Sequence, residues 1–475
     1  MFRLGERRKK LRGSVWKMVC LWLCLGCLAF GAEQNSSRIC EEEEYVLLTS
    51  GNNYAEIYDC EGNCVGKCRA YLDEYCAAAT IEKESILTYA DGENWTVFSM
   101  AQRKNILEFP IEGYSISVSG DKCLVTDYTE KTICLYDNNG TLLYSDENEA
   151  LGDEYGGYGK LMRLEEGYLV GVCVYTEENT VPAKNPVWIS EDGEVQREIN
   201  AFEIVEAFYK GNISSFGDYL VIHDWQNGNN SVYDLNGTLL LDQVETCIYP
   251  YISDSWAYDI TSDIVLVIKK NQERYTAYDK NLNIYATFPY SGDAYLQYAD
   301  GFLEGMRYEE LGGNVCYGFL TYNGEKRVPY AKTEEGAMVY VDGQLISIPL
   351  NEGEDPVELN EAYVTAGGYN DADTYVKRLI YRESGETLLD SLGDEKNRFY
   401  FTLGRDYCII TEQDRESYRS VISIRDDQNE ICYSSNKVQC QPWKNGYIVL
   451  KRGIYQGIAD RNGNWIIKTT AGWNE

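Results

Sequence analysis

The stretch Thr132-Ile133-Cys134-Leu135-Tyr136-Asp137-Asn138-Asn139-Gly140-Thr141-Leu142-Leu143-Tyr144 places two runs of strand-forming residues on either side of Asp-Asn-Asn-Gly. β-Branched and aromatic residues in short runs bounded by turn residues are typical of a β-hairpin. The aspartate can accept backbone hydrogen bonds at the start of the turn. The glycine can adopt the positive φ that a type I turn followed by a bulge requires. The stretch therefore predicts two antiparallel strands joined by a tight turn.

This Asp-x-x-Gly turn recurs along the chain. The complete copies begin and end at Asp59 and Gly62, Asp137 and Gly140, Asp234 and Gly237, and Asp460 and Gly463. Weaker copies place their fourth residue at Gly193, Leu282, Gly324, Gly385 and Asn429. Most intervals between fourth positions after residue 140 are 42 to 45 residues, which matches the ~40–45 residues of a four-stranded propeller blade. We therefore predict an all-β protein, a β-propeller-like ring of repeated antiparallel strand modules with seven or eight blades.

The longest interval between copies runs from Gly324 to Gly385. It contains a further strand-turn-strand phrase at residues 341–346, which is either an insertion or a decayed repeat. Counting every copy gives more modules than the usual four to eight blades, so some modules would share a blade or the ring would have an unusual blade number. We expect a functional elaboration of the scaffold in this interval. One short helix is also expected, near residues 200–209.

The N-terminus has the layout of a secretory signal peptide. Basic residues precede an apolar segment from Met18 to Phe30, which small residues follow. A lipoprotein signal that acylates Cys27 is an alternative, and an uncleaved anchor of this length would be short for a bilayer. We expect a leader over residues 1–32, a short acidic linker over 33–44 and the propeller-like domain over 45–475. The expected location is extracytoplasmic, either secreted or anchored at the cell surface, with membrane contact only through the leader or a lipid.

The charge of the chain is strongly negative. It has 43 lysines and arginines against 76 aspartates and glutamates, a formal net charge of −33. Such a surface repels nucleic-acid phosphates and anionic lipid headgroups. The acids are scattered, and no loop has the alternating oxygen ligands and closing glutamate of an EF-hand. We therefore expect no nucleic-acid partner, no metal site and no cofactor.

Cysteine is frequent, with 16 in the chain, three of them in the leader. A dense cluster comprises Cys60, Cys64, Cys68 and Cys76. Its spacing differs from the Cys-x-x-Cys pairs of structural zinc sites, so disulfides, buried thiols and metal binding stay open as alternatives. A two-residue turn at Tyr128-Thr129 would place Cys123 directly opposite Cys134 on the adjacent strand, which predicts a disulfide between them.

The C-terminal copy, Tyr455-Gln456-Gly457-Ile458-Ala459-Asp460-Arg461-Asn462-Gly463-Asn464-Trp465-Ile466-Ile467, resembles the WG-repeat pattern. In that pattern a Gly-hydrophobic strand enters an Asp-Gly turn and leaves through Trp-hydrophobic-Ile. Residues 317–325 are similar but lack the aspartate and the tryptophan. The resemblance implies a bacterial, exported β-propeller-like protein. It transfers no catalytic residue, because the matching positions are turn and strand positions.

Two classes of function follow. The chain contains one histidine, His223, so any imidazole base would depend on it alone, and phosphate-binding loop motifs are absent. We expect an exported, non-enzymatic binding or interaction module that presents a ligand-binding face to a protein, peptide or glycan. The alternative is an extracytoplasmic carbohydrate-active hydrolase with paired carboxylates, which would need two facing acids in a pocket ringed by aromatic residues. No catalytic residue is identified.

Overall fold

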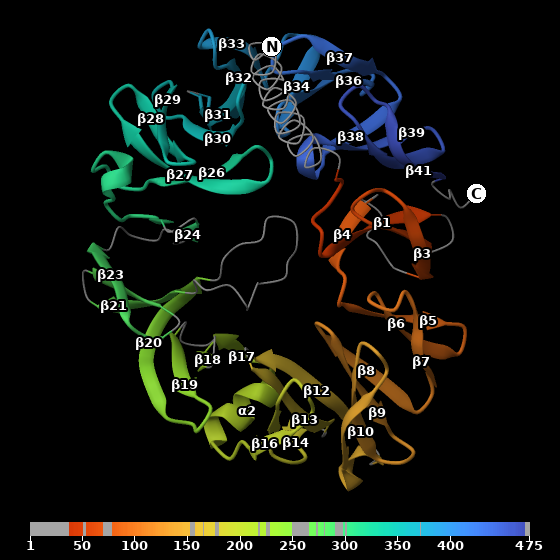
Figure 1. Ribbon diagram of the computed structural model, residues 1–475. Helices are drawn as coiled ribbons and strands as arrows, with labels where there is room; N and C mark the ends of the chain where they lie inside the picture. Colours follow the sequence, from red (N-terminus) through yellow and green to blue (C-terminus); the bar gives the residue numbers. More distant parts are fainter. Residues whose placement is uncertain are drawn as a thin grey trace, which may run out of the picture.

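The computed structural model describes residues 38–50, 54–69, 78–152, 157–164, 166–175, 180–216, 219–224, 229–248, 266–271, 274–279, 281–289, 298–299, 302–370 and 372–470. Its strands form sheets that follow one another round a ring, and the chain goes round this ring once (Figure 1). All but one of the strand pairings among the described residues are antiparallel. The predicted all-β, β-propeller-like architecture is confirmed.

The first part of the ring consists of small sheets built from neighbouring strands. The strand orders are β3-β2-β1-β4, β5-β6-β7, β8-β9-β10-β11 and β12-β13-β15-β16, with β14 paired to β13. The bounds are β1 (Glu44–Ser50), β2 (Tyr54–Tyr58), β3 (Cys64–Arg69), β4 (Ala78–Glu82), β5 (Ile86–Asp91), β6 (Asn94–Ser99), β7 (Lys104–Pro110), β8 (Tyr114–Ser119), β9 (Lys122–Asp127), β10 (Thr132–Asp137), β11 (Leu142–Glu147), β12 (Gly157–Leu164), β13 (Gly167–Tyr175), β14 (Thr180–Pro182), β15 (Val187–Ile189) and β16 (Val195–Glu198).

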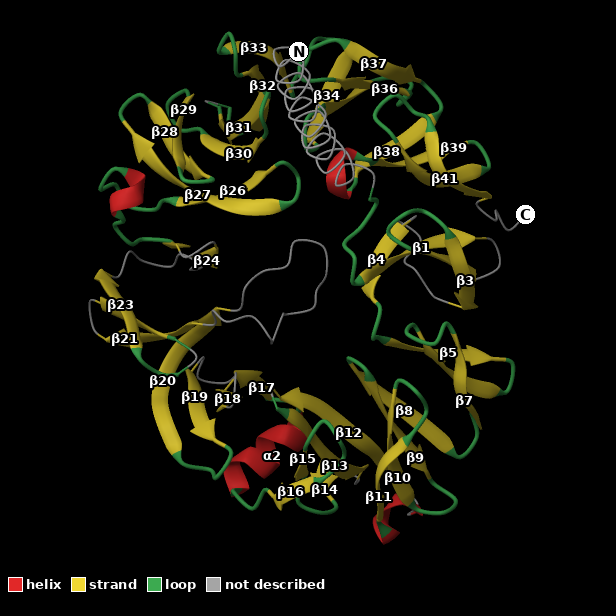
Figure 2. Cartoon of the chain, in the orientation of Figure 1, coloured by secondary structure: helices red, strands yellow, loops and turns green. Residues whose placement is uncertain are grey.

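The middle of the ring contains the helix that the sequence predicts near residues 200–209. This helix, α2 (Phe202–Lys210), ends at Gly211 with φ of 76° and packs against β14, β17 and β18 (Figure 2). A seven-stranded sheet follows in chain order from β17 to β23, and β24 pairs with β25. The bounds are β17 (Ile213–Phe216), β18 (Tyr219–Asp224), β19 (Asn229–Asp234), β20 (Leu239–Ile248), β21 (Leu266–Asn271), β22 (Arg274–Tyr278), β23 (Ile284–Pro289), β24 (Tyr298–Ala299) and β25 (Phe302–Leu303).

The long interval of the sequence forms an eight-stranded sheet of order β29-β28-β27-β26-β30-β31-β32-β33. Its two four-stranded halves are joined by the parallel pairing of β26 with β30, in which Thr321 faces Glu358 and Tyr322 faces Leu359. The bounds are β26 (Gly318–Tyr322), β27 (Lys326–Thr333), β28 (Gly336–Val341), β29 (Gln344–Pro349), β30 (Asp355–Leu359), β31 (Tyr363–Tyr369), β32 (Tyr375–Tyr381) and β33 (Glu386–Asp390).

Two four-stranded sheets complete the ring, with orders β34-β35-β36-β37 and β38-β39-β40-β41. Because the seven- and eight-stranded sheets each join more strands than one four-stranded module, the expected number of seven or eight blades stays a prediction. The bounds are β34 (Asn397–Leu403), β35 (Cys408–Asp414), β36 (Ser420–Arg425), β37 (Ile431–Ser435), β38 (Val438–Pro442), β39 (Ile448–Arg452), β40 (Tyr455–Ala459) and β41 (Trp465–Thr470), with 3-10 turns at Glu149–Gly152, Glu309–Leu311 and Lys444–Gly446.

The hydrophobic core is divided among the interfaces between neighbouring sheets. Strand β35 shows how, since Ile410 packs toward β31 and β34, whereas the adjacent Ile409 packs toward β39. Successive residues of a strand point to opposite faces, and both faces of this strand are covered. This explains why such strands read as continuous apolar runs, as in Cys408-Ile409-Ile410.

The complete Asp-x-x-Gly copies share one turn geometry. In the copy at Asp137, Oδ1 accepts hydrogen bonds from the N–H groups of Asn139 (2.9 Å) and Thr141 (2.8 Å), and Gly140 has φ of 80°. The copies Asp59 and Gly62, Asp234 and Gly237, and Asp460 and Gly463 make the same pair of bonds, with glycine φ of 85°, 82° and 78°.

The ring closes where the first sheet meets the last (Figure 1). The Trp443 indole donates to the carbonyl oxygen of Ile39 (2.6 Å), and Lys444 Nζ lies 2.9 Å from Glu44 Oε1. Ile39 and Cys40 are buried in the core between these two sheets. Within the segment expected to be a linker, Ile39 and Cys40 are therefore part of the folded ring, whereas Glu41, Glu42 and Glu43 are exposed.

The predicted register that would pair Cys123 with Cys134 is wrong. The turn between β9 and β10 spans residues 128–131 rather than two residues, so Cys123 faces Tyr136 and Cys134 faces Val125. Both cysteines are free thiols. The alternation of apolar residues is the same for a two-residue and a four-residue turn, and therefore could not distinguish the two registers.

Candidate functional site

A groove opens where the two halves of the eight-stranded sheet meet the turn between β36 and β37. Its volume is about 560 Å³. This groove lies within the long interval between Gly324 and Gly385, apart from its contribution from the β36–β37 turn. The lining residues are Ser347, Ile348, Pro349, Glu361, Ala362, Val364, Ile380, Tyr381, Arg382, Glu383, Gly385, Asp427 and Gln428.

Apolar core residues lie beneath the groove. Ile348, Val364 and Ile380 belong to the core that joins the two halves of the sheet, and each is at most 2% exposed. Ala362 belongs to the next core, between β31 and β34. The groove thus lies over two packed cores whose side chains are almost fully covered, and its exposed lining is more polar than apolar.

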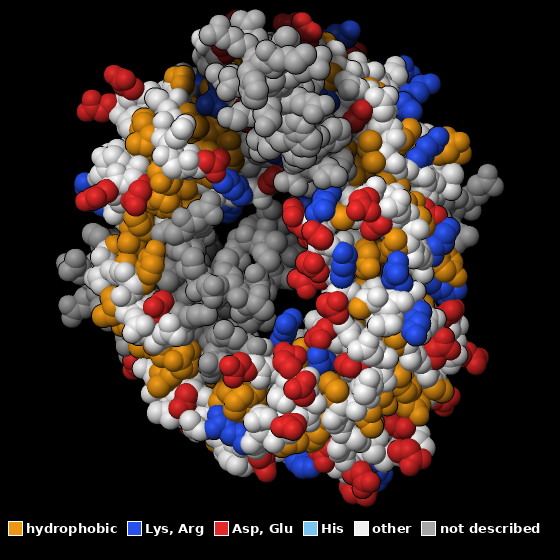
Figure 3. All heavy atoms as spheres, in the orientation of Figure 1, with side chains coloured by type: hydrophobic (Ala, Val, Ile, Leu, Met, Phe, Trp, Pro, Cys, Tyr) orange, Lys and Arg blue, Asp and Glu red, His pale blue; other side chains and the backbone are white. Residues whose placement is uncertain are grey.

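The rim of the groove is acidic. Glu361 precedes β31, Glu383 lies in the turn after β32, and Asp427 lies in the turn after β36; all three side chains are exposed. Acidic side chains are also spread widely over the visible face of the ring (Figure 3). The rim residues differ from those scattered acids because they line a hollow.

Tyr381 and Arg382 are held by their neighbours. The Tyr381 hydroxyl donates to Glu383 Oε2 (3.0 Å) and lies 3.2 Å from the carbonyl oxygen of Asp427, and the bond to Glu383 raises the pKa of Tyr381. Arg382 Nη1 donates to the carbonyl oxygens of Asn360 (2.7 Å) and Glu361 (2.9 Å). Burial lowers the pKa of Arg382 from its high ordinary value.

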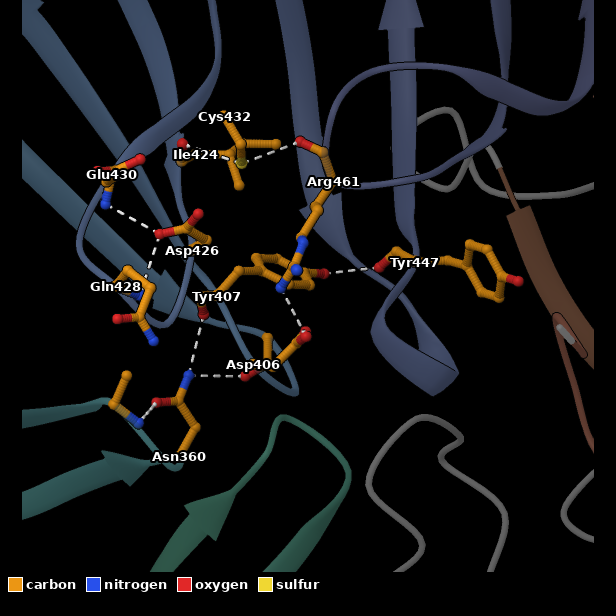
Figure 4. Close-up of polar contacts among 12 residues, drawn as sticks. Asn360, Asp406, Tyr407, Ile424, Asp426, Gln428, Glu430, Cys432, Tyr447 and Arg461 are labelled. Carbon is orange, nitrogen blue, oxygen red and sulfur yellow. Dashed lines mark hydrogen bonds and ion pairs between the residues drawn. The ribbon is translucent and has the colours of Figure 1, made fainter. Parts of the chain in front are cut away.

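The β36–β37 turn is a weaker copy of the repeated turn, and its two middle residues form part of the rim. Asp426 Oδ1 accepts hydrogen bonds from the N–H groups of Gln428 (3.0 Å) and Glu430 (2.9 Å) (Figure 4). The Tyr363 hydroxyl donates to the carbonyl oxygen of Asp426 (2.6 Å). A turn restrained at both ends thus holds Gln428 and its neighbour Asp427 over the groove.

Behind the groove, a buried amide joins two sheets. Asn360 Nδ2 donates to the carbonyl oxygens of Gly404 (2.9 Å) and Tyr407 (3.0 Å), and its Oδ1 accepts from the N–H groups of Ala362 and Tyr363 (Figure 4). Both the Nδ2 and the Oδ1 atoms of this fully buried side chain therefore have hydrogen-bond partners. Satisfied buried networks rigidify their surroundings, so the wall of the groove is held in place.

This network continues away from the groove. The Tyr407 hydroxyl donates to the carbonyl oxygen of Tyr447 (2.6 Å), and Arg461 Nη1 lies 2.6 Å from Asp406 Oδ2 (Figure 4). Each contact joins the sheet β34–β37 to the sheet β38–β41. These residues therefore have a structural role, in contrast to the residues of the rim.

The cysteine cluster is not brought together as one site. Cys60 is buried between the first and last sheets, Cys68 is buried between the first two sheets, and Cys64 is exposed. All three are free thiols, and Cys76 lies outside the described residues. The part of the chain that the structure describes contains no group of three or more His, Cys, Asp or Glu side chains placed to hold a metal ion.

His223 belongs to a polar ladder across three strands. Its Nε2 lies 2.9 Å from Ser214 Oγ on β17, and its Nδ1 lies 2.9 Å from Asn230 Oδ1 on β19. An amide oxygen accepts only, so Nδ1 carries the hydrogen of its contact with Asn230. None of these three residues lines the groove.

The groove could not be found as a set of residues from the sequence, because its members are up to 81 positions apart. The signal that pointed to it was the unusual length of the interval between Gly324 and Gly385.

No described helix combines the length and apolarity needed to cross a membrane.

Comparisons with known proteins do not assign a family. No protein-family model matches the chain, and no curated protein matches it. The WG-repeat resemblance of residues 455–467 therefore stays a prediction.

Among solved structures, the chain is similar to a eukaryotic initiation factor at 8% identity, over 83% of this chain and 96% of the other, with a TM-score of 0.34. It is similar to an uncharacterized protein from Listeria monocytogenes at 10% identity, over 84% and 95%, with a TM-score of 0.28. Similarity to Hsv2 from Kluyveromyces lactis is at 8% identity, over 80% and 96%, with a TM-score of 0.24. Likenesses this distant carry no argument about function.

Proposed function

We propose that the chain is an exported, non-enzymatic binding module and that its ligand lies in the groove between the eight-stranded sheet and the β36–β37 turn. The observation that carries this proposal is the groove itself, which has a volume of about 560 Å³ and lies over packed core residues. Ligand sites are commonly preformed hollows of ~300–1,000 Å³ with a few precisely placed polar groups. The network around Asn360 would keep this surface preorganised for binding.

Binding is favoured over hydrolysis by the exposure of the acids. A general acid for glycoside cleavage needs a carboxyl group whose pKa is raised by an apolar environment. Glu361, Glu383 and Asp427 are all exposed to solvent. Tyr381 is the one aromatic residue of the lining, whereas the hydrolase alternative calls for a ring of them.

Export is proposed from the basic and apolar segments of residues 1–32. Fractionation of the producing cells, followed by N-terminal sequencing of the protein in each fraction, tests it. Recovery from the medium or the cell surface is the expected result, with or without a lipid on Cys27. Recovery only from the cytoplasm would contradict it.

The binding site is tested by blocking the groove. Ser347 is exposed at the rim, so Ser347→Trp places a large side chain over the hollow on a strand that accepts aromatic residues. Val195→Trp is the matched control, because Val195 is 52% exposed on β16, in another sheet. Wild-type and both variants are immobilised and exposed to the cell envelope and medium of the producing cells, and bound molecules are quantified by mass spectrometry.

The expected result is a ligand that wild-type protein and Val195→Trp retain and that Ser347→Trp loses. A ligand retained equally by all three proteins would place the site elsewhere. Glycan turnover that is lost in Ser347→Trp would replace the binding proposal with the hydrolase alternative. Thermal unfolding of each variant confirms that the ring is intact.

A further inference from the structure

We propose that a group of exposed tyrosines on the eight-stranded sheet binds an uncharged glycan, whose sugar rings stack on the tyrosines and whose hydroxyl groups bond to an ion pair between them. This group, the tyrosine platform, comprises Tyr317, Tyr369 and Tyr375 together with the ion pair of Lys332 and Asp355. None of these residues lines the groove. The inference therefore goes beyond the proposed function and does not depend on it.

Two of the tyrosines form a pair at one end of a hairpin. Tyr369 ends β31, Tyr375 begins β32, and the two residues pair directly across the hairpin. Their ring centroids lie 5.4 Å apart with an interplanar angle of 68°, which is a favourable edge-to-face arrangement. Tyr369 is 70% exposed and Tyr375 is 48% exposed. The pair therefore presents its aromatic surface to solvent.

The turn between these two tyrosines is restrained by its first residue. Asn370 Oδ1 accepts hydrogen bonds from the N–H groups of Ala372 and Thr374, both at 3.0 Å. Asp373, the fourth residue, has φ of 54°. The turn thus resembles the repeated Asp-x-x-Gly turn with asparagine in the first place. It holds the tyrosine pair in position, which reduces the conformational entropy that binding would cost.

The hydroxyl end of Tyr375 reaches toward Asp355. A Cβ added at Gly367 would clash with the Tyr375 hydroxyl oxygen, so this ring extends over the bare backbone of the glycine. Gly367 pairs with Asp355 on β30, and residues directly opposite each other in a sheet share one face. Burial raises the pKa of Tyr375 and the charge of Asp355 raises it further, which agrees with a carboxylate close to the hydroxyl.

The ion pair connects this tyrosine pair to the third tyrosine. Lys332 Nζ lies 2.8 Å from Asp355 Oδ1, and the buried Tyr330 donates its hydroxyl to the same oxygen at 3.1 Å. Lys332 Nζ also lies 4.2 Å from the centroid of the Tyr317 ring, in a cation–π contact. Tyr317 is 49% exposed, and the side chains of Lys332 and Asp355 are 34% and 42% exposed. The platform is thus one continuous surface with a polar centre between aromatic rings.

Such a surface suits a sugar chain. The C–H groups of a pyranose ring can pack on the face of an aromatic ring, which carries partial negative charge, and the contact removes apolar surface from water. The hydroxyl groups of the sugar need hydrogen-bond partners, and an ammonium group donates to them while a carboxylate accepts from them. Aromatic rings on both sides of a polar centre therefore match the apolar faces and polar edges of a glycan.

The charge of the platform favours a neutral glycan. Lys332 and Asp355 neutralise each other, and the chain as a whole has a formal net charge of −33. A glycan that carries carboxylate or sulfate groups would be repelled by this field. The inferred ligand is therefore an oligosaccharide of uncharged sugars.

An extended peptide would find fewer partners here. The strands that carry or adjoin the platform are β26, β27, β30, β31 and β32, and each lies inside the sheet with a neighbour on both sides. Extended peptides commonly bind by adding a strand to a free sheet edge. The platform offers no such edge.

The test is an array of immobilised neutral oligosaccharides of glucose, mannose, galactose, xylose and N-acetylglucosamine, with oligogalacturonate as the anionic probe, exposed to the purified full-length protein. Calorimetry with the best neutral binder then gives the dissociation constant for wild type and variants. The platform variant is Tyr369→Ala with Tyr375→Ala, whereas Tyr369→Phe with Tyr375→Phe keeps both rings. The matched control is Tyr400→Ala with Tyr418→Ala, since these tyrosines are 51% and 75% exposed in the next sheet, β34–β37.

We expect binding of at least one neutral oligosaccharide and no binding of oligogalacturonate. The dissociation constant should rise at least about tenfold in the platform variant, because stacking on both rings is lost, and change less than about threefold in the phenylalanine variant. The control should stay within about twofold of wild type. Tyr369→Ala alone removes a side chain that is 70% exposed and should still raise the constant at least about threefold, which keeps the test valid if the double variant unfolds.

The inference fails if no neutral oligosaccharide binds, if oligogalacturonate binds as well as the neutral probes, or if the platform variant and the control lose affinity equally. It also fails if peptides selected from a displayed library need Tyr369 and Tyr375 while no glycan binds, because the platform would then serve a peptide. Ser347→Trp should bind the glycan as the wild type does. Loss of glycan binding in Ser347→Trp but not in the platform variant would place the glycan in the groove, so that the platform fails and the proposed function stands.

Discussion

Two neighbouring junctions of the ring, where one sheet packs against the next, contain the same kind of turn. The contacts of the turn with the neighbouring sheet differ between them. At the junction between the sheets β34–β37 and β38–β41, the turn at residues 460–464 lies against Tyr433 of the earlier sheet. At the junction before it, the turn at residues 426–430 lies against Tyr363 of the eight-stranded sheet. In both turns the aspartate Oδ1 accepts two backbone N–H groups at 2.8 to 3.0 Å. The local geometry is the same, and the neighbouring sheet makes the difference.

The difference lies in the fourth residue of the turn. Gly463 has φ of 78°, and a Cβ at this position would lie 2.6 Å from Tyr433 Cδ2. Asn429 has φ of 62°, and its side chain is accommodated, with Oδ1 accepting from Arg425 Nη1 at 3.2 Å. The junction at residues 460–464 therefore has no room for a side chain at the fourth turn position, whereas the junction at residues 426–430 accommodates one.

The middle residues of the two turns also differ in their roles. Arg461 forms an ion pair with Asp406 and ties two sheets together. Asp427 and Gln428, at the corresponding place, remain exposed at the rim of the groove. A repeated turn with constant backbone geometry can thus serve as a sheet-to-sheet contact in one module and as part of a binding surface in the next.

The largest effect is expected from closing the space at Gly463. Gly463→Ala should lower the free energy of unfolding by about 3 kcal/mol, since it combines a disfavoured φ with overlap against Tyr433. Gly453→Ala is the control in the same sheet, because φ is 62° there and nothing lies within 4 Å of the added Cβ. The control should cost about 1 kcal/mol. Urea unfolding measures both, and equal losses would show that the tyrosine contact is unimportant.

The next largest loss of stability is expected from replacing the aspartate that begins each turn. Asp460→Ala removes two backbone hydrogen bonds and one from Asn464 Nδ2, so we expect a loss of about 2 kcal/mol. Asp426→Ala removes two backbone bonds and should cost about 1 kcal/mol. Asp460→Asn keeps an acceptor oxygen and should restore most of the stability. A loss in Asp460→Asn as large as in Asp460→Ala would mean that charge, rather than hydrogen bonding, supports the turn.

Tyr363 should make the stability of the junction at residues 426–430 depend on pH. Tyr363→Phe should cost about 1 kcal/mol at neutral pH, because the bond to the Asp426 carbonyl is lost. Burial raises the pKa of Tyr363 above its ordinary value, which is about 10. The folded state therefore keeps its proton where the unfolded state loses it, and this stability is complete below about pH 10 and declines at higher pH.

The stability of Tyr363→Phe should consequently fall less steeply above about pH 10 than that of the wild type. Denaturation at neutral and alkaline pH measures the difference. The matched change Tyr400→Phe, at a side chain that is 51% exposed on β34, serves as the control for loss of a tyrosine hydroxyl at the surface. Parallel slopes for wild type and Tyr363→Phe would contradict the assignment.

The smallest effect is expected at Asn429. Asn429→Gly keeps the positive φ, the bond from Tyr363 to Asp426 and the bond from Arg425 to the backbone oxygen of residue 429. We expect a loss of no more than about 0.5 kcal/mol, because glycine is permitted here but is more flexible in the unfolded chain. Thermal unfolding measures the change. A loss as large as that of Gly463→Ala would show that the asparagine side chain supports the junction.

The sequence predicted most of what depends on neighbouring residues. The Asp-x-x-Gly turns, the strands beside them and α2 all rest on contacts within about one turn or one strand. The register of β9 and β10 was wrong because two turn lengths fit the same apolar alternation, and the choice is made by packing of whole strands. Residues 33–44 are expected to be a linker because four glutamates dominate their composition, whereas the burial of Ile39 and Cys40 depends on a sheet some four hundred residues away.

The amino-acid sequence alone thus establishes a chain of hairpin modules, since aspartate hydrogen bonding and glycine φ are local properties. The groove required the folded ring, because Ser347, Ile380 and Asp427 come from segments that share no local interaction. The same holds for the choice between Gly463 and Asn429, which depends on whether the neighbouring sheet places a ring or a hydroxyl group against the turn. Side chains from different sheets meet only after the sheets have packed, and that packing turns identical turns into different surfaces.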